Sequence, residues 1–160
     1  MLLASAAFLP ASASAAILDA PRGGDASFFW LAPTVASAPA STGFNATLLN
    51  SLAVEVCILD ANSRCRSGAP AARLTSTTAA TPGRLTMDAA NQYYTVDWNT
   101  STTPYFPDAT YRARVLRGTT EIGILDVVFV LNKPQLGLAD AGRFKSVMRG
   151  QIQTLRFRVR

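Results

Sequence analysis

Residues 107–127 read PDATYRARVLRGTTEIGILDV, and this segment decides the fold class. Its first part alternates apolar and polar residues, a turn containing Gly118 follows, and a second apolar run completes it. This order is typical of two antiparallel strands joined by a tight turn, expected here at residues 110–117 and 121–131. Both faces of the second strand are apolar, so we expect one face to meet the opposite sheet and the other to meet a loop or a partner.

Further strand-like segments recur along the chain at the spacing typical of β-sandwiches. They are expected at residues 28–31, 52–59, 73–77, 84–88, 92–98 and 152–160. Residues 136–147 fit a helical turn or two, and no other segment has a convincing amphipathic helical pattern. We therefore predict an all-β, antiparallel β-sandwich of about eight strands.

The 160 residues suffice for one sandwich with a sizeable core. We place the sandwich at residues 44–160. Residues 1–43 are rich in Ala, Ser and Pro, and we predict that they form an extended N-terminal arm.

The composition argues against most enzyme mechanisms. The chain contains no histidine, which is the commonest general acid-base group and metal ligand. Its two cysteines cannot complete a four-ligand zinc site. No serine lies in a Gly-x-Ser-x-Gly elbow, and only Lys133 and Lys145 are available to activate one. We expect neither catalysis nor a cofactor.

Oxygen-bearing side chains near the predicted strand ends offer a calcium site as an alternative. These residues are Asp88, Asn91, Asp97, Asn99 and Asp108. The chain contains no Asp-x-Asp-x-Asp-Gly loop. Hydrogen-bonded turn residues are the ordinary interpretation of such side chains.

Cys57 and Cys65 flank an Asp-Ala-Asn-Ser turn that follows an apolar strand. A bridge across this turn is geometrically plausible, and a single pair in an exported protein is most economically a disulfide. The chain has no Cys-x-x-Cys motif that would indicate a redox site. We predict a Cys57–Cys65 disulfide.

The N-terminal residues resemble a secretory signal. Residues 1–9 form an apolar run and residues 10–15 end in Ala-Ser-Ala, although a basic start is missing. The segment is too short and too interrupted to span a bilayer. We expect an extracytoplasmic location, with the segment either removed or retained as an apolar arm. If it is retained, its apolar side chains are expected to contact partners. These are Leu2, Leu3, Phe8 and Leu9.

The aromatic run Phe28, Phe29 and Trp30 allows two interpretations. It is either a first edge strand, which we favour, or an exposed anchor that binds a partner. We therefore include these three residues among the candidate partner-binding residues.

Basic residues are concentrated near the C-terminal end. The net charge is +5, and residues 141–160 contain six Arg or Lys and no acid. The expected last strand alternates apolar residues with Arg156, Arg158 and Arg160. We expect this arginine row to lie on a surface that meets carboxylate or phosphate groups, although a merely solvated face is the alternative.

Several short motifs connect the chain with a known family. They are VEVC at 54–57 with Cys65, YTVDW at 94–98, DATYRARV at 108–115, Gly123 with the DV pair at 126–127, and LRFRV at 155–159. Together they resemble the bacterial extracytoplasmic immunoglobulin-like modules of secreted and surface proteins, over about the last two thirds of the chain. The motifs occupy structural positions, so the resemblance implies an immunoglobulin-like or fibronectin-type fold and little about activity.

The resemblance also implies roles for single residues. The start of the strand at Tyr111 resembles a tyrosine corner, which implies a buried ring and a hydroxyl bonded to the backbone a few residues upstream. Trp98 is expected to be structural. The strand at 110–117 is implied to neighbour the last strand, so that Arg112 and Arg114 join the arginine row in one cationic surface.

The function expected from these features is docking. Some bacteria recruit such sandwiches to the periplasmic face of photosynthetic reaction-centre and antenna complexes, and the apolar arm and basic end suit a subunit of this kind. We expect a non-enzymatic structural subunit that contacts protein subunits or anionic lipid head groups, without nucleic acid or a small-molecule substrate. The alternative is a self-standing surface module for adhesion, glycan or protein binding, or filament assembly.

Overall fold

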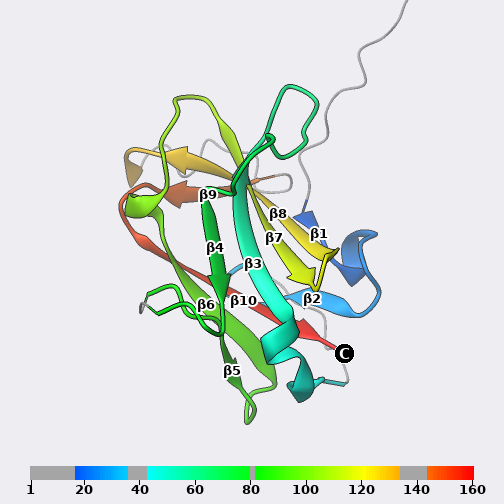
Figure 1. Ribbon diagram of the computed structural model, residues 1–160. Helices are drawn as coiled ribbons and strands as arrows, with labels where there is room; N and C mark the ends of the chain where they lie inside the picture. Colours follow the sequence, from blue (N-terminus) through cyan, green and yellow to red (C-terminus); the bar gives the residue numbers. More distant parts are fainter. Residues whose placement is uncertain (1–16, 36–42, 80–81, 134–143) are drawn as a thin grey trace, which may run out of the picture.

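The computed structural model describes residues 17–35, 43–79, 82–133 and 144–160 (Figure 1). These residues form two β-sheets packed face to face, which confirms the predicted all-β sandwich. Ten strands are present in the described residues, where about eight were expected. All pairings are antiparallel except that of β8 with β9.

The first sheet has the order β1-β8-β7-β3-β4, and β9 also pairs with β8. Its strands are β1 (Ile17–Leu18), β3 (Leu52–Ile58), β4 (Ala72–Thr75), β7 (Thr110–Arg117), β8 (Thr120–Val130) and β9 (Lys145–Met148). The hairpin of β7 and β8 is the strand-turn-strand unit expected from residues 107–127.

The second sheet has the order β2-β10-β6-β5. Its strands are β2 (Phe28–Trp30), β5 (Thr86–Asp88), β6 (Tyr93–Asn99) and β10 (Ile152–Val159). Three short 3-10 helices lie in the connections of the described chain, namely η1 (Ala20–Arg22), η2 (Ala46–Ser51) and η3 (Thr100–Thr102).

Side chains of alternate residues from both sheets form the core, as the period-2 geometry of strands requires. Two aromatic groups fill it. Phe28, Trp30, Tyr94 and Phe157 pack together at one end of the sandwich, with neighbouring ring centroids 4.9–5.9 Å apart. At the other end, Phe129 contacts two rings at 4.4 and 5.5 Å, those of Tyr111 and Trp98.

The predicted boundary at residue 43 is wrong for the described residues. β1 pairs with β8 and β2 pairs with β10, so residues assigned to an arm contribute a strand to each sheet. Burial of Phe28 and Trp30 between the sheets supplies the free energy that orders this segment. Leu2, Leu3, Phe8 and Leu9 lie outside the described residues.

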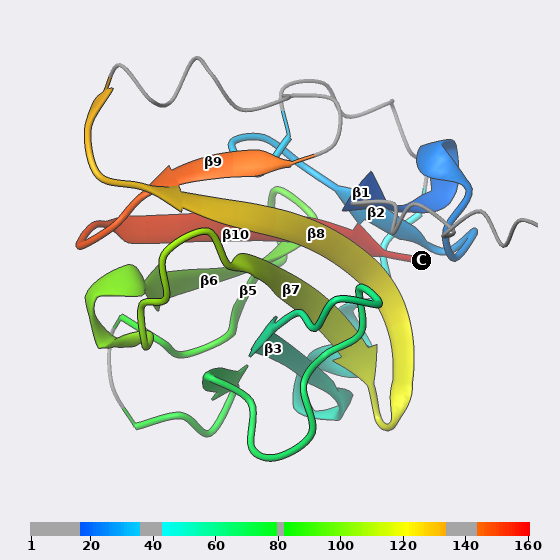
Figure 2. The same ribbon diagram turned by 90° about the horizontal axis from the view of Figure 1, so that it is seen from above.

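The expected helical turn at residues 136–147 is also wrong where the structure describes it. Lys145–Met148 forms β9, which runs parallel to the C-terminal half of β8 (Figure 2). Val147 is buried there against the core. β9 thus extends the first sheet beside β8.

β7 and β10 belong to different sheets, so the expected single surface of five arginines is wrong. The neighbours of β7 are β3 and β8, whereas those of β10 are β2 and β6. Arg112 and Arg114 therefore lie on the outer face of the first sheet, and the row of Arg156, Arg158 and Arg160 lies on the outer face of the second.

Candidate docking surface

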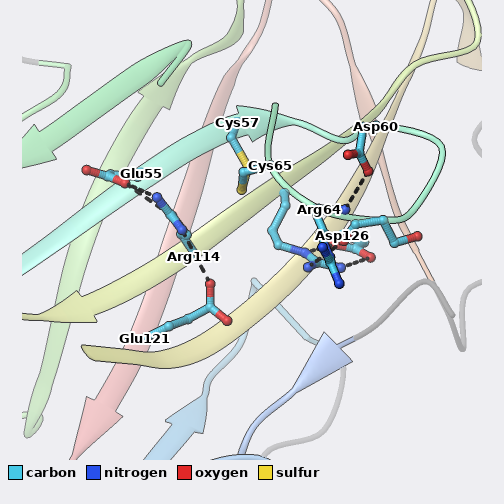
Figure 3. The surroundings of a disulfide bond; sticks show 10 residues. Glu55, Cys57, Asp60, Arg64, Cys65, Arg114, Glu121 and Asp126 are labelled. Atoms are coloured by element: carbon cyan, nitrogen blue, oxygen red, sulfur yellow. Dashed lines mark hydrogen bonds and ion pairs between the residues drawn. A yellow bond between two sulfur atoms is a disulfide. The ribbon is translucent and has the colours of Figure 1, made fainter. Parts of the chain in front are cut away.

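The outer face of the first sheet carries a chain of ion pairs that crosses four strands. Figure 3 shows its central part, in which Arg114 lies between Glu55 and Glu121. Glu55 of β3 is nearly buried and binds Arg73 of β4 and Arg114 of β7, the latter at 2.7 Å. Arg114 also lies 3.8 Å from Glu121 of β8. Each of these cations therefore has an acidic partner within the sheet.

Arg112 and Asp126 form a second, more deeply buried pair on the same face. The guanidinium donates two hydrogen bonds to the carboxylate, from Nε at 2.7 Å and from Nη2 at 3.0 Å, and a third at 3.1 Å to the carbonyl of Ser63. Asp126 is fully buried. Hydrogen bonding to Asp126 raises the pKa of Arg112. Intramolecular acids thus neutralise both Arg112 and Arg114, and the role of these two residues in partner binding stays a prediction.

The predicted disulfide joins Cys57 of β3 to Cys65, with the two Cα atoms 5.4 Å apart. It fixes the loop after β3 beside Asp126 (Figure 3), and Arg112 donates to the carbonyl of Ser63 in this loop. The carboxylate of Asp60 accepts backbone hydrogen bonds from Asn62 at 2.8 Å and Arg64 at 2.9 Å, and these bonds lower the pKa of Asp60. The loop is thus held by a covalent bond and by an Asx-type turn.

The outer face of the second sheet presents the arginine row of β10. The guanidinium of Arg156 lies 4.3 Å from the ring centroid of Tyr93, and that of Arg160 lies 4.4 Å from the ring centroid of Phe29. Arg158 instead donates to the carbonyls of Gln92 at 2.7 Å and Asn91 at 3.3 Å. Aromatic faces and carbonyl groups therefore position all three cations along one strand.

The arginine row of β10 differs from Arg112 and Arg114 of the first sheet in its ion pairing. Among the described residues, no acidic side chain lies within 4.0 Å of the charged nitrogens of Arg156 or Arg160. Two acids lie on the same face, but Asp97 accepts a hydrogen bond from Thr154 and Asp88 accepts from Asn91. A hydrogen bond with Asp88 raises the pKa of Tyr93. The second sheet thus displays ordered cations that lack an ion-pair partner at two positions.

The aromatic run of β2 is structural, and the interpretation as an exposed anchor is wrong. Phe28 and Trp30 are fully buried, and Phe29 is nearly so beneath Arg160. The Trp30 indole nitrogen donates to the carbonyl of Ile124 at 3.0 Å. This bond ties the second sheet to β8 of the first.

Tyr111 and Trp98 have the structural roles that were expected. Tyr111 is fully buried, and its hydroxyl donates to the carbonyl of Pro104 at 2.8 Å and accepts from the amide of Phe106 at 2.9 Å. Trp98 is buried and donates to the Thr103 hydroxyl at 2.8 Å. The tyrosine fixes the loop that enters β7.

The edge of the second sheet at β2 is capped by the preceding loop. The amide of Trp30 points away from β10 and donates to the carboxylate of Asp19 at 3.1 Å, and the amide of Phe28 donates to the carbonyl of Asp25 at 3.1 Å. Asp19 is fully buried and also binds Arg22 at 2.7 Å. These bonds occupy the backbone groups with which an added strand would pair.

The edges of the first sheet are also partly closed. At β4, the amide of Thr75 donates to the Thr78 hydroxyl at 2.8 Å. The carbonyl of Thr75 accepts from the amide of Leu85 at 3.0 Å. At the other edge, on the side of β8 away from β7, β1 pairs with residues 124–125 and β9 pairs with residues 127–130. Neither edge offers a long unpaired strand within the described residues.

The candidate calcium ligands do not converge. Asp88 and Asn91 bind each other in the turn between β5 and β6, Asp97 lies within β6, and Asn99 caps η3. Asp108 lies in the turn before β7. No group of three or more His, Cys, Asp or Glu that could hold a metal ion occurs in the part of the chain that the structure describes.

Comparisons with protein-family models, curated proteins and solved structures find no match to this chain. Within the described ranges, no helix has the length and apolar character needed to cross a bilayer. The functional argument therefore depends on the surfaces of the sandwich itself.

Proposed function

We propose that the protein is a non-enzymatic docking subunit that binds the extracytoplasmic face of a larger membrane-associated complex and stabilises it. One observation carries the proposal, namely the difference between the two arginine sets. The first sheet neutralises Arg112 with Asp126 and Arg114 with Glu55, whereas the second sheet holds Arg156 and Arg160 over aromatic rings without an acidic partner in the described chain.

Such an arrangement suits a binding surface. Stacking on Tyr93 and Phe29 restricts the guanidinium groups, so less side-chain entropy is lost when a partner binds. The planar guanidinium fits a carboxylate in a bidentate manner. The partner is therefore an acidic protein surface that meets the arginine row along β10.

The sheet edges favour side-chain docking over strand addition. Asp19 and Asp25 cap β2, and Thr78 and Leu85 cap the end of β4. Growth of a filament by strand addition requires unpaired edge groups, so these caps argue against strand addition at β2 and at the end of β4.

The disulfide supports the proposed extracytoplasmic location. Disulfides persist mainly in oxidising compartments, which agrees with an extracytoplasmic protein. A photosynthetic reaction-centre and antenna complex is the assembly that the resemblance of the sequence suggests for the partner.

Fractionation of source membranes tests the proposal. A docking subunit copurifies with membrane proteins in fixed stoichiometry after detergent extraction, whereas a self-standing module is released as a monomer by osmotic shock. A truncated variant that tests the N-terminal segment should lack only residues 1–16, because β1 begins at Ile17 and pairs with β8.

Charge reversal tests the surface itself. Arg156→Glu, Arg158→Glu and Arg160→Glu together should abolish copurification, and the exposed Arg160→Glu alone should weaken it and alter its salt dependence. Arg117→Glu, at the exposed end of β7, is the matched control. Thermal melting checks that each variant is folded. Full copurification of the folded triple variant would contradict the proposal.

A further inference from the structure

The large apolar side chains that are exposed in the described residues lie at one end of the sandwich. They are Phe106, Leu131 and Ile152, with exposed fractions of 45%, 59% and 56%. Leu131 follows β8, Ile152 begins β10, and Phe106 lies in the loop that leads into β7. In Figures 1 and 2, the end of β8 and the start of β10 lie at the end of the sandwich away from the C-terminus.

Contacts of neighbouring residues link the segments that carry these side chains. The guanidinium of Arg149 lies 4.7 Å from the ring centroid of Tyr105, next to Phe106 in the chain. Arg149 and Leu131 also line the same hollow, of about 220 Å³, together with Ser101 and Gly150. The amide of Thr100 donates to the carbonyl of Gln151 at 3.2 Å, which holds the turn before Ile152 beside η3.

Basic side chains surround this apolar group. Arg66 lies 5.9 Å from the ring centroid of Phe106, and Arg66 and Arg149 are both exposed, as is Lys133. Three acids line a hollow at the same end, namely Asp60, Asp108 and Asp126, and Asp126 is paired with Arg112. The carboxylate of Asp60 is occupied by the backbone amides of its own turn. We define Arg66, Phe106, Leu131, Arg149 and Ile152 as the loop-end surface.

We propose that the loop-end surface binds the interface of a bilayer that contains anionic lipids. Phenylalanine, leucine and isoleucine side chains on loop tips bury apolar area at the boundary between head groups and acyl chains. Arginines beside them extend their charged groups to lipid phosphates while their aliphatic stems remain in the apolar layer. The charge of Arg66 and Arg149 is the feature that favours an anionic membrane over an uncharged apolar partner.

This surface is separate from the arginine row. The side chains of Arg156 and Arg160 lie on the broad face of the second sheet, whereas the loop-end surface lies where the strands begin and end. A subunit could thus contact a protein through one surface and lipid through the other. The membrane proposal does not rest on the proposed function, and the two are tested with different variants.

Tryptophan fluorescence of the full chain tests the membrane proposal. The native Trp30 and Trp98 are buried, so an added tryptophan at position 106 reports its own surroundings. The probes are vesicles of phosphatidylcholine alone and vesicles of phosphatidylcholine and phosphatidylglycerol in equal parts. Phe106→Trp emission should shift to shorter wavelength with the anionic vesicles and much less with the neutral ones. Thr119→Trp, in the exposed turn at the opposite end, should not shift.

Charge variants measure the role of the arginines. Arg66→Gln and Arg149→Gln should each lower the partition coefficient for anionic vesicles about fivefold, whereas Arg117→Gln should leave it unchanged. Arg160→Glu should retain the Phe106→Trp shift, which separates this surface from the arginine row.

Three outcomes would overturn the membrane proposal. The first is failure of the chain to bind anionic vesicles, and the second is binding without a shift at position 106. The third is a shift at position 106 that grows with protein concentration in the absence of vesicles, which would assign the surface to a contact between two copies of the chain.

Discussion

The ring of Phe28 in β2 occupies the space that a Cβ atom on Gly123 of β8 would require. Gly123 lies in register with Val115 on the core side of the first sheet, and the missing side chain lets the edge of the Phe28 ring meet the backbone. The second sheet therefore approaches the first closely at this point. Most of the rest of β8 carries large apolar residues, so this position is a local exception.

Gly123→Ala should destabilise the protein by about 1–3 kcal/mol, because the added methyl group overlaps the Phe28 ring. Phe28→Leu is the matching change, since it removes the ring atoms that collide. Urea unfolding of both single variants and the double variant should give a coupling of at least about 0.5 kcal/mol, with Phe28→Leu costing less in the Gly123→Ala background. Strict additivity would show that the two residues do not conflict.

Removing the carboxylate of Asp126 should cost about 3–5 kcal/mol, because it leaves Arg112 with an uncompensated charge that is mostly buried. Asp126→Asn is the test variant. Replacement of both residues by Leu should cost much less than Asp126→Asn alone. Glu121→Gln is the control, since Glu121 is about one-third exposed and lies 3.8 Å from Arg114, and it should cost no more than about 1 kcal/mol.

Tyr111→Phe should cost about 1–3 kcal/mol, because the carbonyl of Pro104 and the amide of Phe106 both lose their partner. Tyr105→Phe serves as the control and should change the free energy of unfolding by less than about 0.5 kcal/mol. An unchanged melting temperature for Tyr111→Phe would mean that the hydroxyl does not stabilise the loop before β7.

The protein should lose stability at alkaline pH through its buried tyrosines. Burial raises the pKa of both Tyr94 and Tyr111 above the usual value of 10.0. The folded protein therefore retains these protons to higher pH than the unfolded chain does. Their contribution is complete below about pH 10 and is lost as the pH rises through the folded pKa values. Ultraviolet titration should show late tyrosinate formation coupled to unfolding, and Tyr94→Phe should remove part of the late absorbance.

The Cys57–Cys65 disulfide should be present in freshly isolated protein, where mass spectrometry without reductant should find no free thiol. Replacing both cysteines by serine should lower the free energy of unfolding by at most about 2–3 kcal/mol, because the bond closes only a short loop. Arg112 donates to the carbonyl of Ser63 in this loop, so some order should survive the loss of the bond. A larger loss would mean that the disulfide also supports the Arg112–Asp126 pair.

Strand periodicity predicts most of the sandwich, because burial of one face of a strand requires apolar residues at alternate positions. The segments at 110–117, 121–131 and 152–160 are correct to within about one residue at each end. β1 and β9 were not predicted, because they are short and their strand conformation depends on pairing with β8. Their two to four residues carry too little periodic signal to separate a strand from a loop.

The expected surface of five arginines is correct only in part, because its composition depends on the order of the strands in the sheets. Alternation alone places Arg156, Arg158 and Arg160 on one face, and the structure confirms this. The same reasoning cannot tell which strand lies beside β7. A signal was present in the sequence, since Glu55 interrupts an apolar strand and an acid at such a position requires a cationic neighbour.

β10 pairs on both sides, with β2 near the start of the described chain and with β6 in its middle. It is the last of the described strands to be synthesised, so the second sheet has a gap at its centre until residues 152–159 have left the ribosome. Without β10, the inner faces of β2 and β6 lack the Leu155, Phe157 and Val159 side chains that complete the core. Folding therefore follows translation of nearly the whole sandwich, and a nascent chain should remain sensitive to protease until that point.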